Sequence, residues 1–382
     1  MAINRTSPKK GKVVDLPEQT ITIGTATAGI ESASVAFTVA STPATGGRVS
    51  RYTAISNPGS ITRTGNASPI VVTGLTSGSS YTFQVAAANG SGNGPLSAAS
   101  NSITAITNTI SADFLAVAGG GAMQSLNPTY YQSGGGGGGL RSSISGNGGG
   151  ASAESALTFN VGTAYTITVG AGGANGNGDP SVRKGGNSSI AGSGFTTLTA
   201  EGGGGAGQID NNGGFGAGAG GSGGGAGGND IGSAGGVAVS PTQGFKGGDT
   251  TGISHASAGA GGGGAGSAGQ NKTTNSLVGG NGGNAKINTI TATGVDVYYA
   301  GGGAGAGGYD PPTDGANGTG YSRNANTGSG GSANGTNNGT GCSGVVILRA
   351  LRAATATTGS PVYTTQGSWH IYQFNGNGTI TY

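Results

Sequence analysis

The chain has 382 residues and a formal net charge of +3, and charged residues make up only 8% of it. The length allows two or three domains, and the scattered Lys and Arg do not form the basic stripe of a nucleic-acid-binding surface. Cys342 is the only cysteine, which excludes an intramolecular disulfide and a thiolate metal cluster, and no apolar run reaches the ~20 residues that a membrane span needs.

Residues 1–16 are predicted to form an N-terminal arm. They carry the basic residues Arg5, Lys9, Lys10 and Lys12. This composition is typical of a solvated tail, and it also fits a docking arm that becomes ordered on a partner. The segment has no hydrophobic signal core, so we expect synthesis in a cytoplasm.

Residues 17–105 alternate apolar and polar side chains in short runs that are separated by Gly, Pro and Asn. About seven runs of period two within about 90 residues indicate a β-sandwich. The apolar positions are Ile21, Ile23, Val35, Phe37, Val39, Tyr52, Ile55, Ile70, Val72, Tyr81, Phe83 and Val85.

The sequence Gly74-Leu75-Thr76-Ser77-Gly78-Ser79-Ser80-Tyr81 resembles the E–F corner of a fibronectin type III module. The resemblance makes Tyr81 the corner tyrosine. Residues 94–100 are similar to the final strand of that module. Phe37 stands where the family commonly has a strand-B Trp, a departure that affects the volume of the core. No RGD tripeptide is present, so integrin binding is not implied.

Residues 106–350 are dominated by glycine, which makes up roughly a third of residues 119–344 without a strict G-X-Y period. A helix would cost about 1 kcal/mol per Gly relative to Ala, and pleated strands would lack cross-strand side-chain pairs. Runs such as 134–139 can therefore be disordered, or form polyproline-II helices packed so closely that only Gly fits between them. Such a stack has to offset about 1–2 kcal/mol of backbone entropy per residue, so it needs rigid ends.

Short strand-like runs supply candidates for those ends. Residues 114–118 and 345–348 are continuous apolar runs typical of fully buried strands, whereas residues 156–159 and 165–169 alternate apolar with polar. Similar runs occur at 195–199 and 295–299. Because charges are few and β-branched and aromatic residues recur, we predict an ordered domain rather than a disordered one.

Four motifs in a fixed order resemble the glycine-rich domains of tailed-phage structural proteins: residues 115–121, 165–173, 186–189 and 344–349. Residues 359–361 and 369–382 are similar to the closing strands of such proteins. The resemblance implies stacked polyproline-II (polyglycine-II) helices that display host-binding loops. The predicted fold is mostly β: a fibronectin type III-like β-sandwich over 17–105, a glycine-rich domain of short β-strands and packed polyproline-II helices over 106–350, and closing C-terminal β-strands over 351–382.

Side-chain-rich stretches interrupt the glycine and are expected where the chain turns at the ends of the stack. Their aromatic, amide and charged residues could grip a sugar ring or a protein surface, or could cap the stack. Both interpretations stay open for Tyr309 and Tyr321, whereas capping is favoured for Phe195 and Phe215. The candidate receptor-contact residues are Tyr130, Tyr131, Phe245, His255, Tyr309, Asp310, Tyr321 and Arg323.

Catalytic chemistry has little support in the sequence. The sequence has only two histidines. It lacks a Ser-His-Asp order with an elbow motif, and it also lacks the HExxH and CxxC motifs. Residues 303–308 match G-x-G-x-x-G, but such matches arise by chance among so many glycines, and no helical pattern follows. Asp210, Asp230 and Asp249 lack the register of a calcium-binding nonapeptide repeat. We therefore predict no enzyme activity, no catalytic residues, no cofactor and no metal site.

The phage resemblance implies a non-enzymatic virion protein, foremost a tail-fibre or tail-tip adhesin for host attachment. The expected partners are other virion proteins, docked through residues 1–105, and a host cell-surface glycan or protein. Nucleic-acid binding and membrane insertion are not expected, and a homo-oligomer stays open. Synthesis in the host cytoplasm without a signal peptide fits a virion released by lysis. The alternatives are a head fibre or capsid decoration anchored through the fibronectin-like module, a silk-like matrix protein and an ice-binding protein.

Overall fold

The computed structural model describes residues 15–41, 45–123, 132–176, 179–207, 216–227, 232–239, 243–251, 258–272, 278–291, 296–307, 318–320, 322, 324–333 and 339–382. The chain divides into two compact units, Met1–Asn108 and Thr109–Tyr382. Within the described ranges the structure is mostly β, and the helices are two short 3₁₀ turns, Gly148–Gly150 and Pro180–Arg183. No described helix is long and apolar enough to cross a bilayer. The prediction of a mostly β fold is confirmed.

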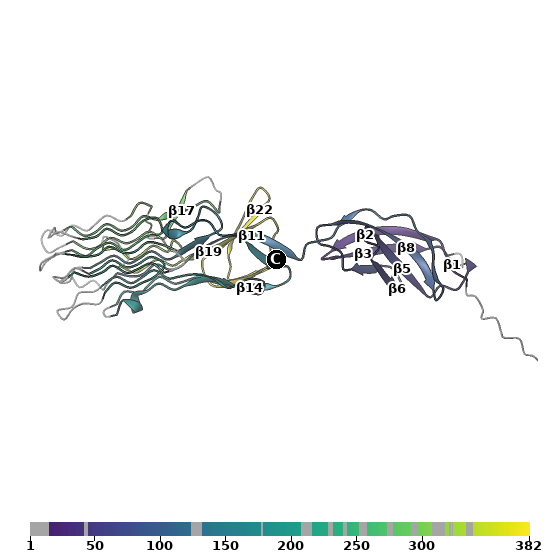
Figure 1. The fold of residues 1–382 in the computed structure, drawn as a ribbon, viewed down its shortest axis with the longest axis horizontal. Helices are drawn as coiled ribbons and strands as arrows, with labels where there is room; N and C mark the ends of the chain where they lie inside the picture. The colour runs from purple at the N-terminus through teal and green to yellow at the C-terminus, as the bar shows by residue number, and fades with distance from the viewer. Residues whose placement is uncertain are drawn as a thin grey trace, which may run out of the picture. The chain divides into compact units, whose positions relative to one another are not determined.

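The first unit is built from short antiparallel strands (Figure 1). One sheet has the order β2–β3–β7, and a second has the order β10–β8–β5–β6 with β9 also paired to β8. β1 and β4 form a small separate pair. The bounds are β1 Pro17–Glu18, β2 Ile21–Gly29, β3 Ser32–Val39, β4 Thr45–Gly46, β5 Arg51–Asn57, β6 Thr62–Gly65, β7 Ile70–Thr73, β8 Ser80–Asn89, β9 Gly92–Leu96 and β10 Ile103–Thr104.

The alternation along these strands places one side-chain face of each sheet in a shared core, where Phe83 is fully buried. The ring of Phe37 packs against that of Tyr52 with centroids 5.0 Å apart, so two smaller rings fill the volume expected for a Trp. At the corner, the Tyr81 hydroxyl accepts a hydrogen bond from the Thr76 N–H (3.0 Å). This is the contact expected of a tyrosine corner.

The second unit contains two larger antiparallel sheets and a hairpin. One sheet has the order β12–β11–β19–β22–β21, with β13 also paired to β11, and the other has the order β16–β15–β14–β23–β20. β17 and β18 form the hairpin. The bounds are β11 Thr109–Val117, β12 Leu140–Ser142, β13 Leu157–Asn160, β14 Ala164–Thr168, β15 Ser188–Ala191, β16 Leu198–Ala200, β17 Lys286–Asn288, β18 Val297–Tyr299, β19 Val345–Ala350, β20 Ala356–Thr358, β21 Val362–Gln366, β22 Trp369–Phe374 and β23 Gly378–Thr381.

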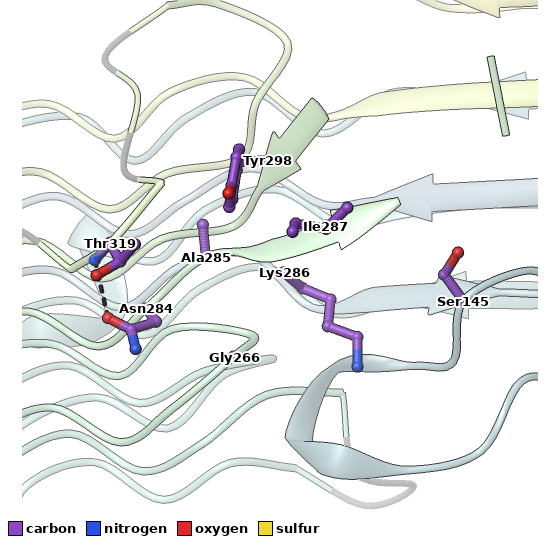
Figure 2. Close-up of a pocket in the computed structure, with 8 residues that line it drawn as sticks. All are labelled: Ser145, Gly266, Asn284, Ala285, Lys286, Ile287, Tyr298 and Thr319. Carbon is purple, nitrogen blue, oxygen red and sulfur yellow. Dashed lines mark hydrogen bonds between the residues drawn. The ribbon is translucent and has the colours of Figure 1, made fainter. Parts of the chain in front are cut away.

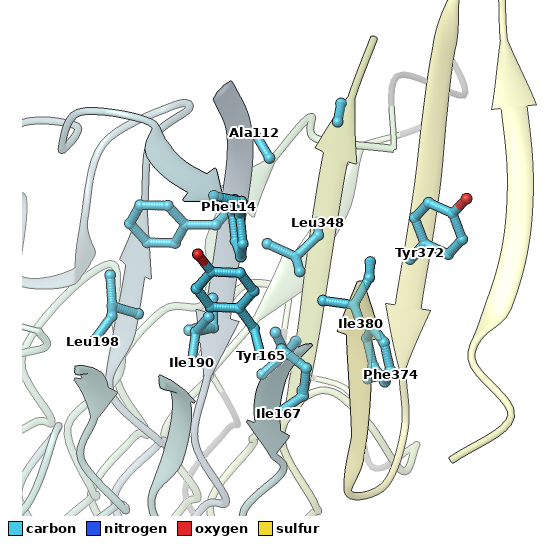
Figure 3. Close-up of a cluster of buried hydrophobic side chains, with 14 of the residues drawn as sticks. Ala112, Phe114, Tyr165, Ile167, Ile190, Leu198, Leu348, Tyr372, Phe374 and Ile380 are labelled. Carbon is cyan, nitrogen blue, oxygen red and sulfur yellow. The ribbon is translucent and has the colours of Figure 1, made fainter. Parts of the chain in front are cut away.

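The central strands β11 and β19 are buried on both faces, as their continuous apolar runs predict. On one face, Phe114 and Leu348 pack with Tyr165 and other side chains of the opposite sheet (Figure 3). On the other face, Leu115 and its neighbours pack with the β17–β18 hairpin. Phe195, for which capping was favoured, stacks on Tyr165 beside this core (centroids 5.6 Å apart).

The glycine segments lie side by side in the second unit (Figure 1) and pair through their backbones. The N–H groups of residues 134–139 donate to three neighbouring segments in turn, and the order repeats every third residue. The acceptors, in chain order, are the carbonyl groups of Ala260, Gly331, Gly204, Gly263, Gly328 and Glu201, at 2.7–3.0 Å. The carbonyl groups of residues 134–139 accept from three further segments, which contain Gly225, Gly303 and Gly121. This segment therefore has six neighbours.

The side-chain-bearing sheets run directly into these glycine segments. β11 ends at Val117, and the Ala118 N–H already donates across to the Gly139 carbonyl oxygen (3.0 Å). β19 starts at Val345, immediately after Gly344, whose N–H donates to the Gly170 carbonyl oxygen (2.8 Å). The sheets are therefore the rigid ends that the glycine segments need.

Candidate functional site

Of the eight residues predicted to contact a receptor, the described part of the chain includes only Phe245. Its N–H donates to the Gly264 carbonyl oxygen (3.1 Å), and its carbonyl oxygen accepts from the Gly223 N–H (3.0 Å), so its backbone belongs to the glycine network. Its side chain is half-buried. The others lie outside the described residues: Tyr130, Tyr131, His255, Tyr309, Asp310, Tyr321 and Arg323.

An open hollow of about 560 Å³ lies beside the β17–β18 hairpin (Figure 2). Its lining combines an aromatic ring, an ammonium group, an amide and hydroxyl groups, and the lining residues come from five separate stretches of the sequence. The lining residues are Ser145, Gly266, Asn284, Ala285, Lys286, Ile287, Tyr298 and Thr319.

The hairpin holds its residues in place through its inner face. Ile287 pairs with Tyr298 in the ladder, and the next pair along is Asn288 with Val297. The Asn288 side chain is 1% exposed, and its Nδ2 donates to the Ser142 Oγ (2.8 Å) and to the Ile144 carbonyl oxygen (2.8 Å). A buried amide with two partners fixes the hairpin against the sheet.

Tyr299 completes the inner face of the hairpin. Its ring is 5% exposed in the apolar cluster that also contains Leu115 and Ile347. Burial raises the pKa of the Tyr299 hydroxyl to about 12, so this group stays neutral and structural at physiological pH. Tyr298 is the next residue back along the strand and so points to the opposite face, toward the hollow.

The opposite wall of the hollow is held by hydrogen bonds between two chain segments (Figure 2). The Thr319 N–H donates to the Asn284 Oδ1 (2.8 Å), and the Ala285 N–H donates to the Thr319 carbonyl oxygen (2.9 Å). Gly320 has a φ of +73° and lies against the Tyr298 ring, where a Cβ would overlap the ring carbons. Glycine at this position therefore allows the ring to sit beside Thr319.

Among the described residues that line the hollow, the one charged group is the Lys286 ammonium. None of the eight lining residues is acidic. Lys286 forms no ion pair with any residue that the structure describes, and its Nζ lies beside the loop at Gly146. At the far rim, the Ser145 hydroxyl is within hydrogen-bond distance of the Thr289 hydroxyl (3.2 Å). Lys286 pairs with Tyr299 in the ladder and so lies on the hairpin face opposite Tyr298, and the two side chains extend in different directions (Figure 2).

Sequence reasoning did not find this hollow. It identified residues 295–299 only as a strand, and β18 begins at Val297 within that run. The short run Lys286-Ile287-Asn288, placed between glycine-rich stretches, was a usable signal for a second strand. Nothing in the sequence showed that Ser145 and Thr319 would join it. In the described residues, no group of His, Cys, Asp and Glu is arranged to hold a metal ion.

The described residues define a mostly β protein in which a small sandwich precedes a glycine-rich domain. The family models agree with this description: residues 25–103 match the fibronectin type III domain, and residues 97–351 match the glycine-rich domain. The second match covers more than half of the chain, and the chain belongs to the glycine-rich domain family. No curated protein and no solved structure matches the chain.

Proposed function

We propose that the glycine segments are packed polyproline-II (polyglycine-II) helices. A polyproline-II helix has three residues per turn and no internal hydrogen bonds, so its N–H and C=O groups are free to pair with neighbours. The three-residue order in which residues 134–139 change neighbours supports this assignment. The backbone φ values of these glycines also lie outside the left-handed region.

On this basis, the protein is a non-enzymatic structural protein of a phage virion, a component of the tail fibre or tail tip that contacts the host surface. The observation that supports this function is the glycine segment 134–139, whose six N–H groups all donate to neighbouring segments and which has six neighbours in all. Such a frame holds the described wall residues of the hollow in fixed positions, which reduces the entropy lost on binding. The fibronectin type III unit serves as a spacer or as the dock to other virion proteins.

The test uses host cells and virions that carry either the full chain or a chain truncated after Asn108. We expect adsorption to fall when the glycine-rich unit is missing, and purified full-length protein to compete with virions for the cells. Unchanged adsorption by the truncated virions would argue against the proposal. Immuno-gold labelling locates the protein at the same time, and label on the head would favour a head fibre instead.

A further inference from the structure

We infer that the free edge of β21 pairs antiparallel with the same strand of a second copy of the chain, so that the protein forms a two-fold dimer through its glycine-rich unit. β21 ends its sheet in the order β12–β11–β19–β22–β21, and no further strand among the described residues pairs with it. All of its residues are exposed, Val362 by 52% and Tyr363 by 49%. The inference goes beyond the proposed function and does not depend on it.

β21 lacks the features by which natural proteins keep edge strands from pairing. Such edges usually carry a charged side chain, a bulge or a Pro, or they are very short. Residues 353–382 contain no Asp, Glu, Lys or Arg, and the register of β21 with β22 runs through five residues without a bulge. The Val, Tyr and Thr residues of β21 are those that favour strands. The edge is therefore open to another strand.

Other edge strands of the described chain do carry such a feature. β2 has a bulge between Ile23 and Ala26, β6 carries Arg63, and β12 carries Arg141. β20, at the edge of the second large sheet of the same unit, has only three residues. The contrast with these protected edges indicates that the open edge of β21 is an interaction surface.

The pairing of β21 with β22 determines which of its backbone groups face outward. Gln366 and Trp369 are partners across a two-residue turn, and the pair that closes such a turn is hydrogen-bonded. Hydrogen-bonded and non-hydrogen-bonded pairs alternate along an antiparallel ladder. The N–H and C=O groups of Thr364 therefore point toward β22, and those of Tyr363 and Thr365 point away from it.

These outward groups match those of a second β21 strand. When two copies pair antiparallel about Thr364, Tyr363 of each copy lies opposite Thr365 of the other copy, and both residues direct their backbone groups across the edge. The two pairs then form four N–H···O=C hydrogen bonds. Thr–Thr and aromatic–β-branched pairs are also favourable between neighbouring strands. A charged strand would find no opposite charge on β21, so a second copy is the occupant that fits both the register and the charge.

The Tyr363 side chain is held away from the open edge. Its ring packs against that of Tyr372 on β22 with centroids 5.0 Å apart, and Tyr372 borders the buried cluster in Figure 3. Its hydroxyl lies 2.7 Å from the Nδ1 of His370, also on β22. Both contacts hold the side chain over β22, so the edge is accessible and little order has to be gained when the strands pair.

Sedimentation velocity of the full-length protein tests the dimer. We expect the sedimentation coefficient to rise from that of a monomer to that of a dimer between about 1 µM and about 200 µM protein. Association stops at the dimer, because a two-fold contact uses the β21 edge of both copies. A monomer at every concentration, or growth into long fibres, would overturn the inference.

Charge exchange at the two-fold axis assigns the contact to β21. Thr364→Lys places two ammonium groups opposite each other, and we expect it to weaken the dimer by at least about tenfold. Thr364→Glu should do the same, whereas an equimolar mixture of the two variants should associate at least as tightly as the parent. Thr357→Lys is the matched control, because it adds the same charge to an exposed residue of β20. Dimers that Thr364→Lys does not weaken, or no recovery in the mixture, would refute the assignment.

A backbone variant tests the predicted hydrogen bonds. Thr365→Pro removes an outward N–H and no hydrogen bond to β22, so we expect the dimer to weaken by at least about tenfold while the chain still folds. Trp369 fluorescence in urea checks the folding of each variant. An unchanged dimer in a folded Thr365→Pro protein would contradict the register, and if this variant does not fold, the charge exchange at Thr364 decides.

Discussion

Gly136 lies in the middle of the glycine segment with six neighbours, and its replacement by Ala tests the packing directly. The Gly136 N–H donates to the Gly204 carbonyl oxygen (2.9 Å), and its own carbonyl oxygen accepts from the Gly121 N–H (2.8 Å). An added Cβ would overlap the Ser222 carbonyl oxygen and lie 2.7 Å from the carbonyl oxygen of Gly223. These atoms are backbone, so the clash cannot be relieved by rotating a side chain.

The expected cost follows from what has to move. Shifting the segment around Ser222 breaks or stretches two hydrogen bonds, from the Ser222 N–H to Gly137 (3.1 Å) and from the Gly225 N–H to Gly134 (2.8 Å). At about 1 kcal/mol each, these contribute about 2 kcal/mol. Overpacking adds about 1–3 kcal/mol, and the lower entropy of Ala in the unfolded chain offsets about 0.4–1 kcal/mol. The net loss of unfolding free energy is about 2–5 kcal/mol.

Trp369 makes the measurement specific to the second unit. It is the only tryptophan, and it lies in β22, so its fluorescence during denaturation in urea reports on this unit alone. Gly216→Ala is the matched control, since nothing lies within 4 Å of its added Cβ. We expect this variant to be up to about 1 kcal/mol more stable than the parent. A Gly136→Ala protein that unfolds at the same urea concentration as Gly216→Ala would refute the close packing.

Three further substitutions test other parts of the fold. Tyr81→Phe removes the hydroxyl that accepts from the Thr76 N–H, and we expect the first unit to lose about 1 kcal/mol of unfolding free energy in calorimetry. An unchanged unfolding free energy would contradict a stabilising role for this tyrosine corner. Phe114→Ala empties a fully buried site in β11 and should cost about 3–5 kcal/mol. Exchange of the backbone amide hydrogens should then speed up in the glycine segments as well as in the sheet. Faster exchange in the sheet alone would contradict the coupling of the glycine segments to the sheet. Burial raises the pKa of Glu154, but the hydrogen bonds and charge of Arg141 outweigh it, so the pKa lies below the ordinary 4.5. The stability that this carboxylate contributes is present above pH 4.5 and is lost as the pH falls through the lower folded-state pKa. Glu154→Gln should therefore reduce the loss of stability at acid pH, measured by Trp369 fluorescence in an acid titration. An unchanged acid titration would refute the assignment.

The sequence was informative where side chains vary with a period and uninformative where they do not. The apolar runs at 114–118 and 345–348 predicted strands buried on both faces, and β11 and β19 have that burial. The pairing of these two strands joins residues more than two hundred positions apart, which no local pattern encodes. Within the glycine, every residue of the run 134–139 is the same, so its neighbours and register have no sequence signal. The hollow escaped prediction for the same reason, because its walls meet only through those pairings.

The same argument explains why the glycine-rich unit contains hydrophobic sheets at all. Register is weakly specified in glycine-rich segments, because a shift moves no side chain into or out of a core. In β11 and β19, by contrast, a slip by one residue would exchange the Phe114 face with the Leu115 face and misplace every apolar contact. Since the glycine segments continue these strands without a break, the register that side chains fix in the sheets is passed to the backbone pairing beyond them. The sheets therefore determine which glycine carbonyl each glycine N–H meets, and through that pairing they hold the walls of the hollow in place.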